Sequence, residues 1–265
     1  TLHINCLSLL FFLLCTVPVW AQSTTKLFND NWHFHRIDTF AVDECSLVRE
    51  GKIPVGWEQV SLPHSARIEP LLVNDQWQGI CYYAKKFDLP DSSKGKKLFI
   101  RFDAAMNVSD VWVNGHHMTT HLGGYLPFTI DISDVAYRGR DNTIVVRLDN
   151  KDNTTTGPKP LYRLDFNTYG GIYRNVWFIE KEKVYITDPV YAGKPASGGI
   201  FITTSQVSRE AAIVNIRTHL KNENSKDKDL VIKYRIRDMK SNIVATQNTE
   251  LNISGTSDNE SKVSI

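Results

Sequence analysis

The chain has 265 residues, of which 42% are hydrophobic, 11% aromatic and 23% charged. This composition is typical of a globular protein and excludes disordered, collagen-like and low-complexity chains. The formal net charge is only +2 and no basic or acidic tract occurs, so we expect neither a nucleic-acid partner nor binding to an anionic membrane surface.

The N-terminal segment predicts export. Residues 7–19 form an apolar run without charge, too short for a membrane span of about 20 residues. Val19 and Ala21 stand three residues and one residue before a cleavage after Ala21, so residues 1–21 are predicted to be a secretory signal peptide. Because the first residue is Thr1 and not Met, we expect the chain to be a piece of a longer protein.

Cleavage after Ala21 leaves two cysteines, Cys45 and Cys81. Two cysteines make no disulfide framework. They either pair in an oxidising compartment or pack separately as small hydrophobic side chains, and the sequence leaves both open. Neither CxxC nor a His/Cys ligand spacing occurs, so no zinc site is predicted.

The apolar residues of the mature chain alternate with period two. The clearest runs are 97–102, 143–149, 213–220 and 230–237. Each predicts a strand with one buried and one solvent-exposed face, as in antiparallel sheets. Asn114-Gly115 after residues 111–113 is a strong hairpin signal, and no amphipathic helix of three turns is evident. The pattern predicts an all-β fold, either a β-sandwich or a barrel.

A change in composition near residues 182–198 predicts two domains. The strand-like run 172–180 ends an aromatic-rich block, and a Pro/Gly-rich segment, residues 189–199, follows. We therefore expect a β-sandwich over residues 22–183 and a smaller immunoglobulin-like β-sandwich over residues 184–265. The alternation in residues 261–265 indicates a strand that is just starting, so the second domain is expected to be truncated.

Three segments carry a resemblance to a known family. They are WEQVSLPHS (57–65), VWVNGHHMTTHLGGYLPFTID (111–131) and DFNTYGGIYRNVW (165–177). In this order and spacing they resemble the N-terminal sugar-binding domain of glycoside hydrolase family 2, the β-galactosidase, β-glucuronidase and β-mannosidase family. The resemblance implies a jelly-roll-type β-sandwich, followed by part of the family's immunoglobulin-like domain.

The resemblance also implies a function. We expect the non-catalytic N-terminal portion of an exported β-galactosidase-type enzyme, periplasmic or secreted in a bacterium, that hydrolyses terminal glycosidic bonds with retention. The catalytic residues and their TIM barrel would follow residue 265, so this chain alone is expected to be inactive. The alternatives are a stand-alone carbohydrate-binding module, or a β-glucuronidase or β-mannosidase of the same family. The expected partner is a carbohydrate, and no cofactor is implied.

Two substrate-binding residues follow from the resemblance. Counting back from Gly171 in the Gly-Ile-Tyr-Arg motif places the family's sugar-binding aspartate at Asp165, whose carboxylate suits vicinal hydroxyls. A turn residue that caps its own loop is the alternative. The family's second sugar-binding residue from this domain is an asparagine. It corresponds to Asn74, with Asp75 as the competing assignment. Trp77 either stacks on a sugar ring or packs down on the sandwich.

Three histidines, His116, His117 and His121, follow the Asn-Gly turn. Alternating strand positions and the lack of a carboxylate in register favour ordinary surface residues over ligands. No metal site is therefore predicted.

Overall fold

The computed structural model describes residues 23–37, 42–69, 75–157, 160–196 and 198–265. Regular structure in these ranges is almost entirely strand, as the sequence predicted. The helical turns there are short: η1 (Cys45–Arg49), η2 (Asp91–Ser93) and η3 (Leu161–Arg163). None of the helices in the described ranges is long and apolar enough to cross a membrane.

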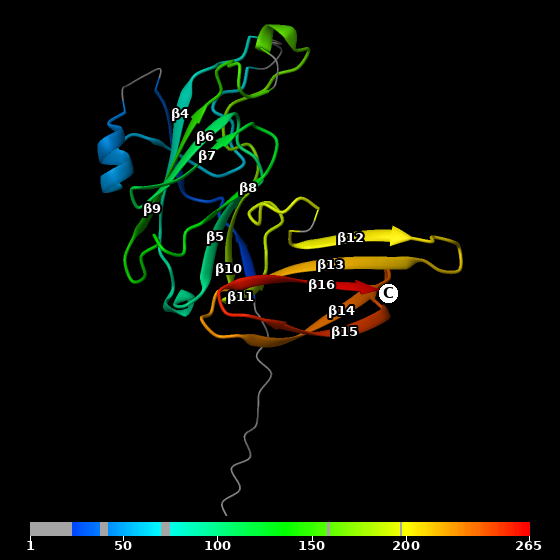
Figure 1. The fold of residues 1–265 in the computed structure, drawn as a ribbon. Helices are drawn as coiled ribbons and strands as arrows, with labels where there is room; N and C mark the ends of the chain where they lie inside the picture. The colour runs from blue at the N-terminus through cyan, green and yellow to red at the C-terminus, as the bar shows by residue number, and fades with distance from the viewer. Residues whose placement is uncertain (1–22, 38–41, 70–74, 158–159, 197) are drawn as a thin grey trace, which may run out of the picture.

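The first sandwich consists of two antiparallel sheets, built from the strands up to β10 (Figure 1). One sheet has the order β1 (Ser23–Leu27), β10 (Val176–Lys181), β5 (Lys97–Phe102), β8 (Phe128–Asp131). The other has the order β3 (Glu58–Val60), β2 (Trp32–Arg36), β4 (Ile80–Phe87), β9 (Asn142–Asp149), β6 (Val108–Val113), β7 (His116–Leu122). The first and last strands of the sandwich, β1 and β10, are neighbours.

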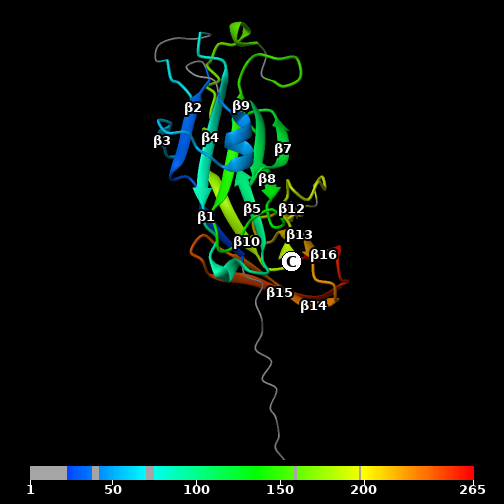
Figure 2. The ribbon, with the colours of Figure 1, turned by 90° about the vertical axis from the view of Figure 1, so that its left-hand side faces the viewer.

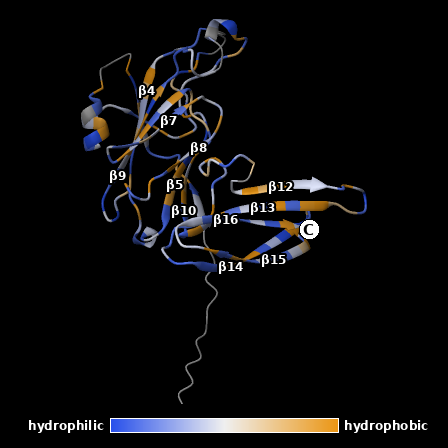
Figure 3. Ribbon diagram, in the orientation of Figure 1, coloured by the Kyte–Doolittle hydropathy of each residue, from blue (hydrophilic) through white to orange (hydrophobic). Residues whose placement is uncertain are grey.

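The core lies between these two sheets. Alternate residues of β5 and β9 enter it, because successive side chains of a strand point to opposite faces. Phe102 of β5 stacks on Phe128 of β8, with ring centroids 4.6 Å apart. Hydropathy follows the same division, since β5 and β10 are mainly hydrophobic and the connecting loops mainly hydrophilic (Figure 3).

The outer faces of β5 and β9 were predicted to be exposed to solvent, but both carry buried side chains. Val145 of β9 is buried in a separate cluster with Leu47 of η1 and Tyr82 of β4. Phe99 of β5 is buried against Tyr185, with ring centroids 5.8 Å apart. The predicted exposed face is wrong here because other parts of the chain cover it, which strand periodicity does not reveal.

The second sandwich consists of the strands that follow β10. In one sheet β13 (Ile213–Asn222) pairs with β11 (Val184–Ile186), β12 (Ile200–Ser205) and β16 (Ser257–Ser264), and the other sheet is the pair β14 (Lys228–Arg237) and β15 (Ile243–Ile253). The Tyr234 hydroxyl of β14 is hydrogen-bonded across the gap between the sheets to two hydroxyls, that of Thr218 on β13 at 3.1 Å and that of Ser261 on β16 at 3.0 Å. This is an immunoglobulin-like sandwich.

The two sandwiches meet at the β5–β10 end of the first (Figures 1 and 2). The Lys97 ammonium of β5 lies 2.7 Å from the Asp131 carboxylate of β8 and 2.9 Å from the Glu223 carboxylate, which follows β13. The Tyr185 hydroxyl donates a 2.7 Å hydrogen bond to the same Glu223. A buried lysine therefore joins carboxylates from both sandwiches.

Two predicted strand boundaries are wrong. The strand expected from residue 172 begins only at Val176, because Ile172 accepts a hydrogen bond from the His64 backbone in a loop. The alternation at residues 261–265 does not open a strand, since β16 already begins at Ser257 and pairs along its length with β13.

Candidate functional site

The loops that carry the three sequence segments meet at the end of the first sandwich that faces away from the second. Figure 1 shows η3 at this end, opposite β11–β16. The His64 N–H donates to the Ile172 carbonyl at 2.9 Å, and the Ala66 N–H donates to the Gly170 carbonyl at 2.7 Å. The first and third segments are therefore tied by backbone hydrogen bonds.

Gly171 makes this close approach possible. Its φ is +127°, a conformation that side-chain-bearing residues rarely adopt. A Cβ at this position would lie 2.5 Å from the His64 carbonyl oxygen. Gly171 also exchanges two backbone hydrogen bonds with Met106, of 2.9 and 3.2 Å. The glycine is thus needed for the crossing of three chain segments.

Side-chain hydrogen bonds attach the neighbouring loops. The Tyr173 hydroxyl donates to the Gly124 carbonyl at 2.6 Å, which links the third segment to the second. The Gln76 amide makes two bonds to Thr168: it donates to the hydroxyl at 2.9 Å and accepts from the backbone N–H at 2.7 Å. The loop after residue 74 is therefore held beside the loop that contains Asp165.

Between these loops lies an aromatic-lined hollow of about 230 Å³. Its walls are residues from the first segment, the second segment and the loop before Gly170: Ser65, Met106, Tyr125, Phe166, Asn167, Thr168, Tyr169 and Tyr173. Phe166 and Tyr125 are 51% and 46% exposed, so aromatic surface is available to a ligand. Burial raises the pKa of Tyr173, whose phenol stays protonated as a hydrogen-bond donor.

Asp165 is exposed and immediately precedes Phe166 of the hollow. Within the described ranges its carboxylate accepts no hydrogen bond and forms no ion pair, so it does not cap its own loop there. A free carboxylate beside an aromatic wall can accept hydrogen bonds from vicinal hydroxyls while the ring contacts sugar C–H groups.

The second predicted residue, Asn74, lies outside the described residues. Its competitor Asp75 is exposed and directly precedes Gln76, the residue bonded to Thr168. The structure thus brings the segment that follows Asn74 next to the Asp165 loop, and the role of Asn74 stays a prediction.

Trp77 packs down on the sandwich, which was one of the two predicted alternatives. Its ring is only partly exposed and contacts the main core cluster, and the Arg36 guanidinium lies 5.7 Å from its centroid. Its backbone N–H donates to the Glu69 carboxylate at 3.2 Å. The aromatic surface of the site is therefore that of Phe166 and Tyr125.

The histidines after the Asn-Gly turn have no carboxylate in register, as predicted, because they pair with Val113, Trp112 and Ser109. One of them, His117, nevertheless has a carboxylate diagonally across the strand pair. His117 Nε2 lies 3.8 Å from Asp110 Oδ1 across the β6–β7 pair. Asp110 also lies 3.2 Å from the Arg147 guanidinium and accepts a 2.6 Å hydrogen bond from Thr120. In the part of the chain that the structure describes, no group of three or more His, Cys, Asp or Glu side chains is placed to hold a metal.

Sequence reasoning missed the residues of the hollow. Tyr125 lies in the loop before β8, whereas Phe166 and Tyr173 lie in the loop before β10, and in the sequence each resembles an ordinary aromatic residue beside a glycine or turn signal. The available signal was that Tyr125 directly follows one Gly-Gly pair and Tyr173 stands two residues after the other, since such pairs let backbone segments come close together.

Comparisons with known proteins agree with this fold. Residues 51–182 match the family model described as glycosyl hydrolases family 2, sugar binding domain. A β-glucuronidase of Bacteroides fragilis is 32% identical over 80% of this chain, and a β-galactosidase of Thermoanaerobacter pseudethanolicus is 31% identical over 63%. The chain covers only 28% and 23% of the lengths of these two relatives.

Solved structures give the same picture. The crystal structure of Bacteroides uniformis β-glucuronidase superimposes with a TM-score of 0.81 and 25% identity, over 92% of this chain and 28% of that one. The class is therefore that of β-sandwich domains of glycosidases. The chain belongs to glycoside hydrolase family 2, and residues 51–182 form its sugar-binding domain.

Proposed function

We propose that this chain is the N-terminal, substrate-recognising portion of a glycosidase that removes a terminal β-linked sugar from a carbohydrate. The observation that carries the proposal is the exposed Asp165, which directly precedes Phe166 of the aromatic hollow and has no partner among the described residues, within the domain that matches a sugar-binding model. Sugar recognition by proteins combines such acceptors with aromatic platforms.

The bond-breaking residues are proposed to lie in a domain that follows residue 265. A retaining glycosidase needs two carboxyl groups about 5–5.5 Å apart. The described residues form strands and short turns and include no α/β barrel. We therefore expect the chain by itself to bind and position sugar without hydrolysing it.

For the sugar, we propose β-galactoside hydrolysis, with β-glucuronide hydrolysis as the second candidate. A β-galactosidase relative supports the first, and two β-glucuronidase relatives support the second. The test is hydrolysis of p-nitrophenyl β-D-galactoside and p-nitrophenyl β-D-glucuronide by the longer protein that contains this chain. Preference for the galactoside supports the first proposal, preference for the glucuronide replaces it with the second, and inactivity on every nitrophenyl glycoside contradicts both.

We further propose that residues 1–21 direct export and that the mature protein is periplasmic or secreted. The uncharged apolar run ending at Ala21 supports this. Fusion of residues 1–30 to alkaline phosphatase tests it, because that enzyme needs an oxidising compartment. Export is supported if the fusion has phosphatase activity and loses it when Leu9–Leu14 are replaced by a charged run. An inactive unaltered fusion contradicts export.

A further inference from the structure

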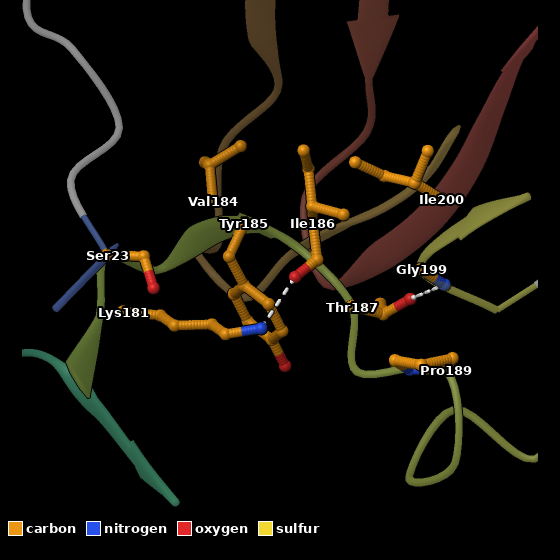
Figure 4. A pocket seen from close by; sticks show the side chains of 9 residues that line it. All are labelled: Ser23, Lys181, Val184, Tyr185, Ile186, Thr187, Pro189, Gly199 and Ile200. Atoms are coloured by element: carbon orange, nitrogen blue, oxygen red, sulfur yellow. Dashed lines mark hydrogen bonds between the residues drawn. The ribbon is translucent and has the colours of Figure 1, made fainter. Parts of the chain in front are cut away.

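A second hollow, distinct from the sugar-binding end, lies where the two sandwiches meet (Figure 4). Its volume is about 430 Å³, within the range of small-molecule sites, which often lie at domain interfaces. The first sandwich contributes Ser23 of β1 and Lys181 of β10. The second sandwich and its preceding loop contribute the rest: Val184, Tyr185, Ile186, Thr187, Pro189, Gly199 and Ile200.

Most of the lining is aliphatic. Val184, Ile186 and Ile200 present their side chains to the hollow, and Ile200 is 54% exposed there (Figure 4). The polar Thr187 hydroxyl is already occupied, because it accepts from the Gly199 N–H at 3.0 Å and lies 2.8 Å from His219 Nδ1. The hollow is therefore apolar except at Lys181 and Ser23.

No carboxylate of the described ranges lies within ion-pairing distance of the Lys181 ammonium, although the Asp188 carboxylate acts on it from farther away. The Lys181 ammonium donates to the Ile186 carbonyl at 2.8 Å and lies 5.4 Å from the Tyr185 ring centroid, but it has no ion pair in these ranges. Lys97 is opposite Lys181 in the β5–β10 register and has two carboxylate partners. Burial lowers the pKa of Lys181, and the opposing effect of the Asp188 carboxylate is too weak to offset it.

We propose that this hollow binds a small organic monocarboxylate with an apolar body. The carboxylate pairs with the Lys181 ammonium, and the apolar body covers Val184, Ile186 and Ile200. A single ammonium balances one negative charge, whereas a phosphate dianion needs more donors than the lining offers. Such a ligand contacts both sandwiches at once, so it also strengthens their junction.

Calorimetric titration of the chain with octanoate, octan-1-ol and acetate tests the proposal. Octanoate is expected to bind about tenfold or more tightly than octan-1-ol, because it alone offers a charge-assisted hydrogen bond. It is also expected to bind more tightly than acetate, because acetate lacks the apolar body. Equal affinity for octanoate and octan-1-ol, or no binding of octanoate, overturns the proposal.

Two variants and one control locate the site. Lys181→Met keeps the apolar stem and is expected to weaken octanoate about tenfold, so that octanoate and octan-1-ol then bind alike. Ile200→Ser changes an exposed wall residue and is expected to weaken octanoate without disturbing the fold. Lys26→Met, on β1 but outside the hollow, is the matched control and leaves the affinity unchanged.

A spectroscopic readout is independent of affinity. In NMR spectra of the chain with ¹³C-dimethylated lysines, the signal of Lys181 is the one that is missing from the spectrum of Lys181→Met. This signal is expected to shift when octanoate is added. Octanoate binding that leaves that signal in place, or that survives both Lys181→Met and Ile200→Ser at full strength, overturns the proposal.

Discussion

Asp165 is the residue on which the proposed sugar contact depends. Its carboxylate has no partner in the described part of the chain, so its replacement leaves the folded structure intact. We predict that Asp165→Asn in the longer enzyme lowers kcat/KM by about 10- to 100-fold, since each charge-assisted hydrogen bond contributes about 1.5–3 kcal/mol. Steady-state kinetics and thermal melting of the same sample measure both effects.

The control for this prediction is Asp141→Asn. Asp141 is an exposed aspartate in the turn before β9 and does not line the hollow. It should keep wild-type kcat/KM. If Asp165→Asn keeps kcat/KM but melts at a lower temperature, Asp165 is a structural turn residue.

Gly171 allows three loops to meet, and its replacement should be costly. Gly171→Ala places a Cβ against the His64 carbonyl and forces alanine into a positive φ. We predict a loss of about 2–4 kcal/mol in the free energy of unfolding, from backbone strain plus the clash. Gly139→Ala, with φ +75° and open space around it, carries only the backbone strain. Urea denaturation of the chain that gives equal losses for both variants would show that the close approach to His64 is unimportant.

His64 links stability to pH. Burial lowers its pKa and outweighs the opposing effect of Glu58, and burial acts in the same direction on His121. The unfolded chain therefore binds protons that the folded chain does not, and stability is lost as the pH falls below the ordinary histidine value of about 6.5 toward the folded pKa. We predict that the urea midpoint drops between about pH 7 and about pH 5.

The variant for this test is His64→Asn, which keeps a polar atom near the Tyr83 hydroxyl, 2.8 Å from His64 Nδ1. Its midpoint should change less over the same pH interval. His116→Asn, at an exposed position of β7, serves as the control. Identical pH profiles for wild type and His64→Asn would exclude His64 as the source of the effect.

Between elements, the Lys97 cluster holds β5 and β8 to the segment after β13. Burial disfavours the Glu223 carboxylate, but hydrogen bonds from Tyr185 and Lys97 outweigh it, and the pKa of Glu223 lies below its ordinary value. We predict that Lys97→Met costs about 2–4 kcal/mol, because it leaves two carboxylates without their shared cation. The free energy of unfolding from urea titration measures this loss.

Lys221→Met is the matched control, since Lys221 also pairs with Glu223, at 3.3 Å, but its side chain is 42% exposed against 11% for Lys97. It should cost less than about 1 kcal/mol. Losses of similar size for both lysines would show that the junction does not depend on the buried ion pairs.

Strands with clear alternation could be predicted closely from sequence, and strands without it could not. Residues 97–102 and the run at 143–149 correspond to β5 and β9, because core packing selects one side chain in two. β1 has no such pattern, since all five of its residues are exposed and its strand conformation comes from pairing with β10. Which outer faces are covered also depends on distant segments, as Leu47 over Val145 illustrates.

For the whole molecule, the family and the Asp165 loop could be predicted, but the hollow could not. Gly171 and Tyr173 are part of a recognisable motif, whereas the contact of that motif with residues near Met106 and Tyr125 depends on the assembled sandwich. The division at residue 183, the export signal and the identity of the sugar stay predictions.

The most direct measurement is a crystal structure of the longer protein with a non-hydrolysable substrate analogue bound. We predict a terminal sugar with a hydroxyl about 2.6–3.2 Å from an Asp165 carboxylate oxygen, the distance of a hydrogen bond, and with Phe166 in contact with the bound carbohydrate. A bound sugar that leaves both Asp165 and Phe166 in contact with solvent alone would contradict the assignment of this end of the first sandwich to substrate recognition.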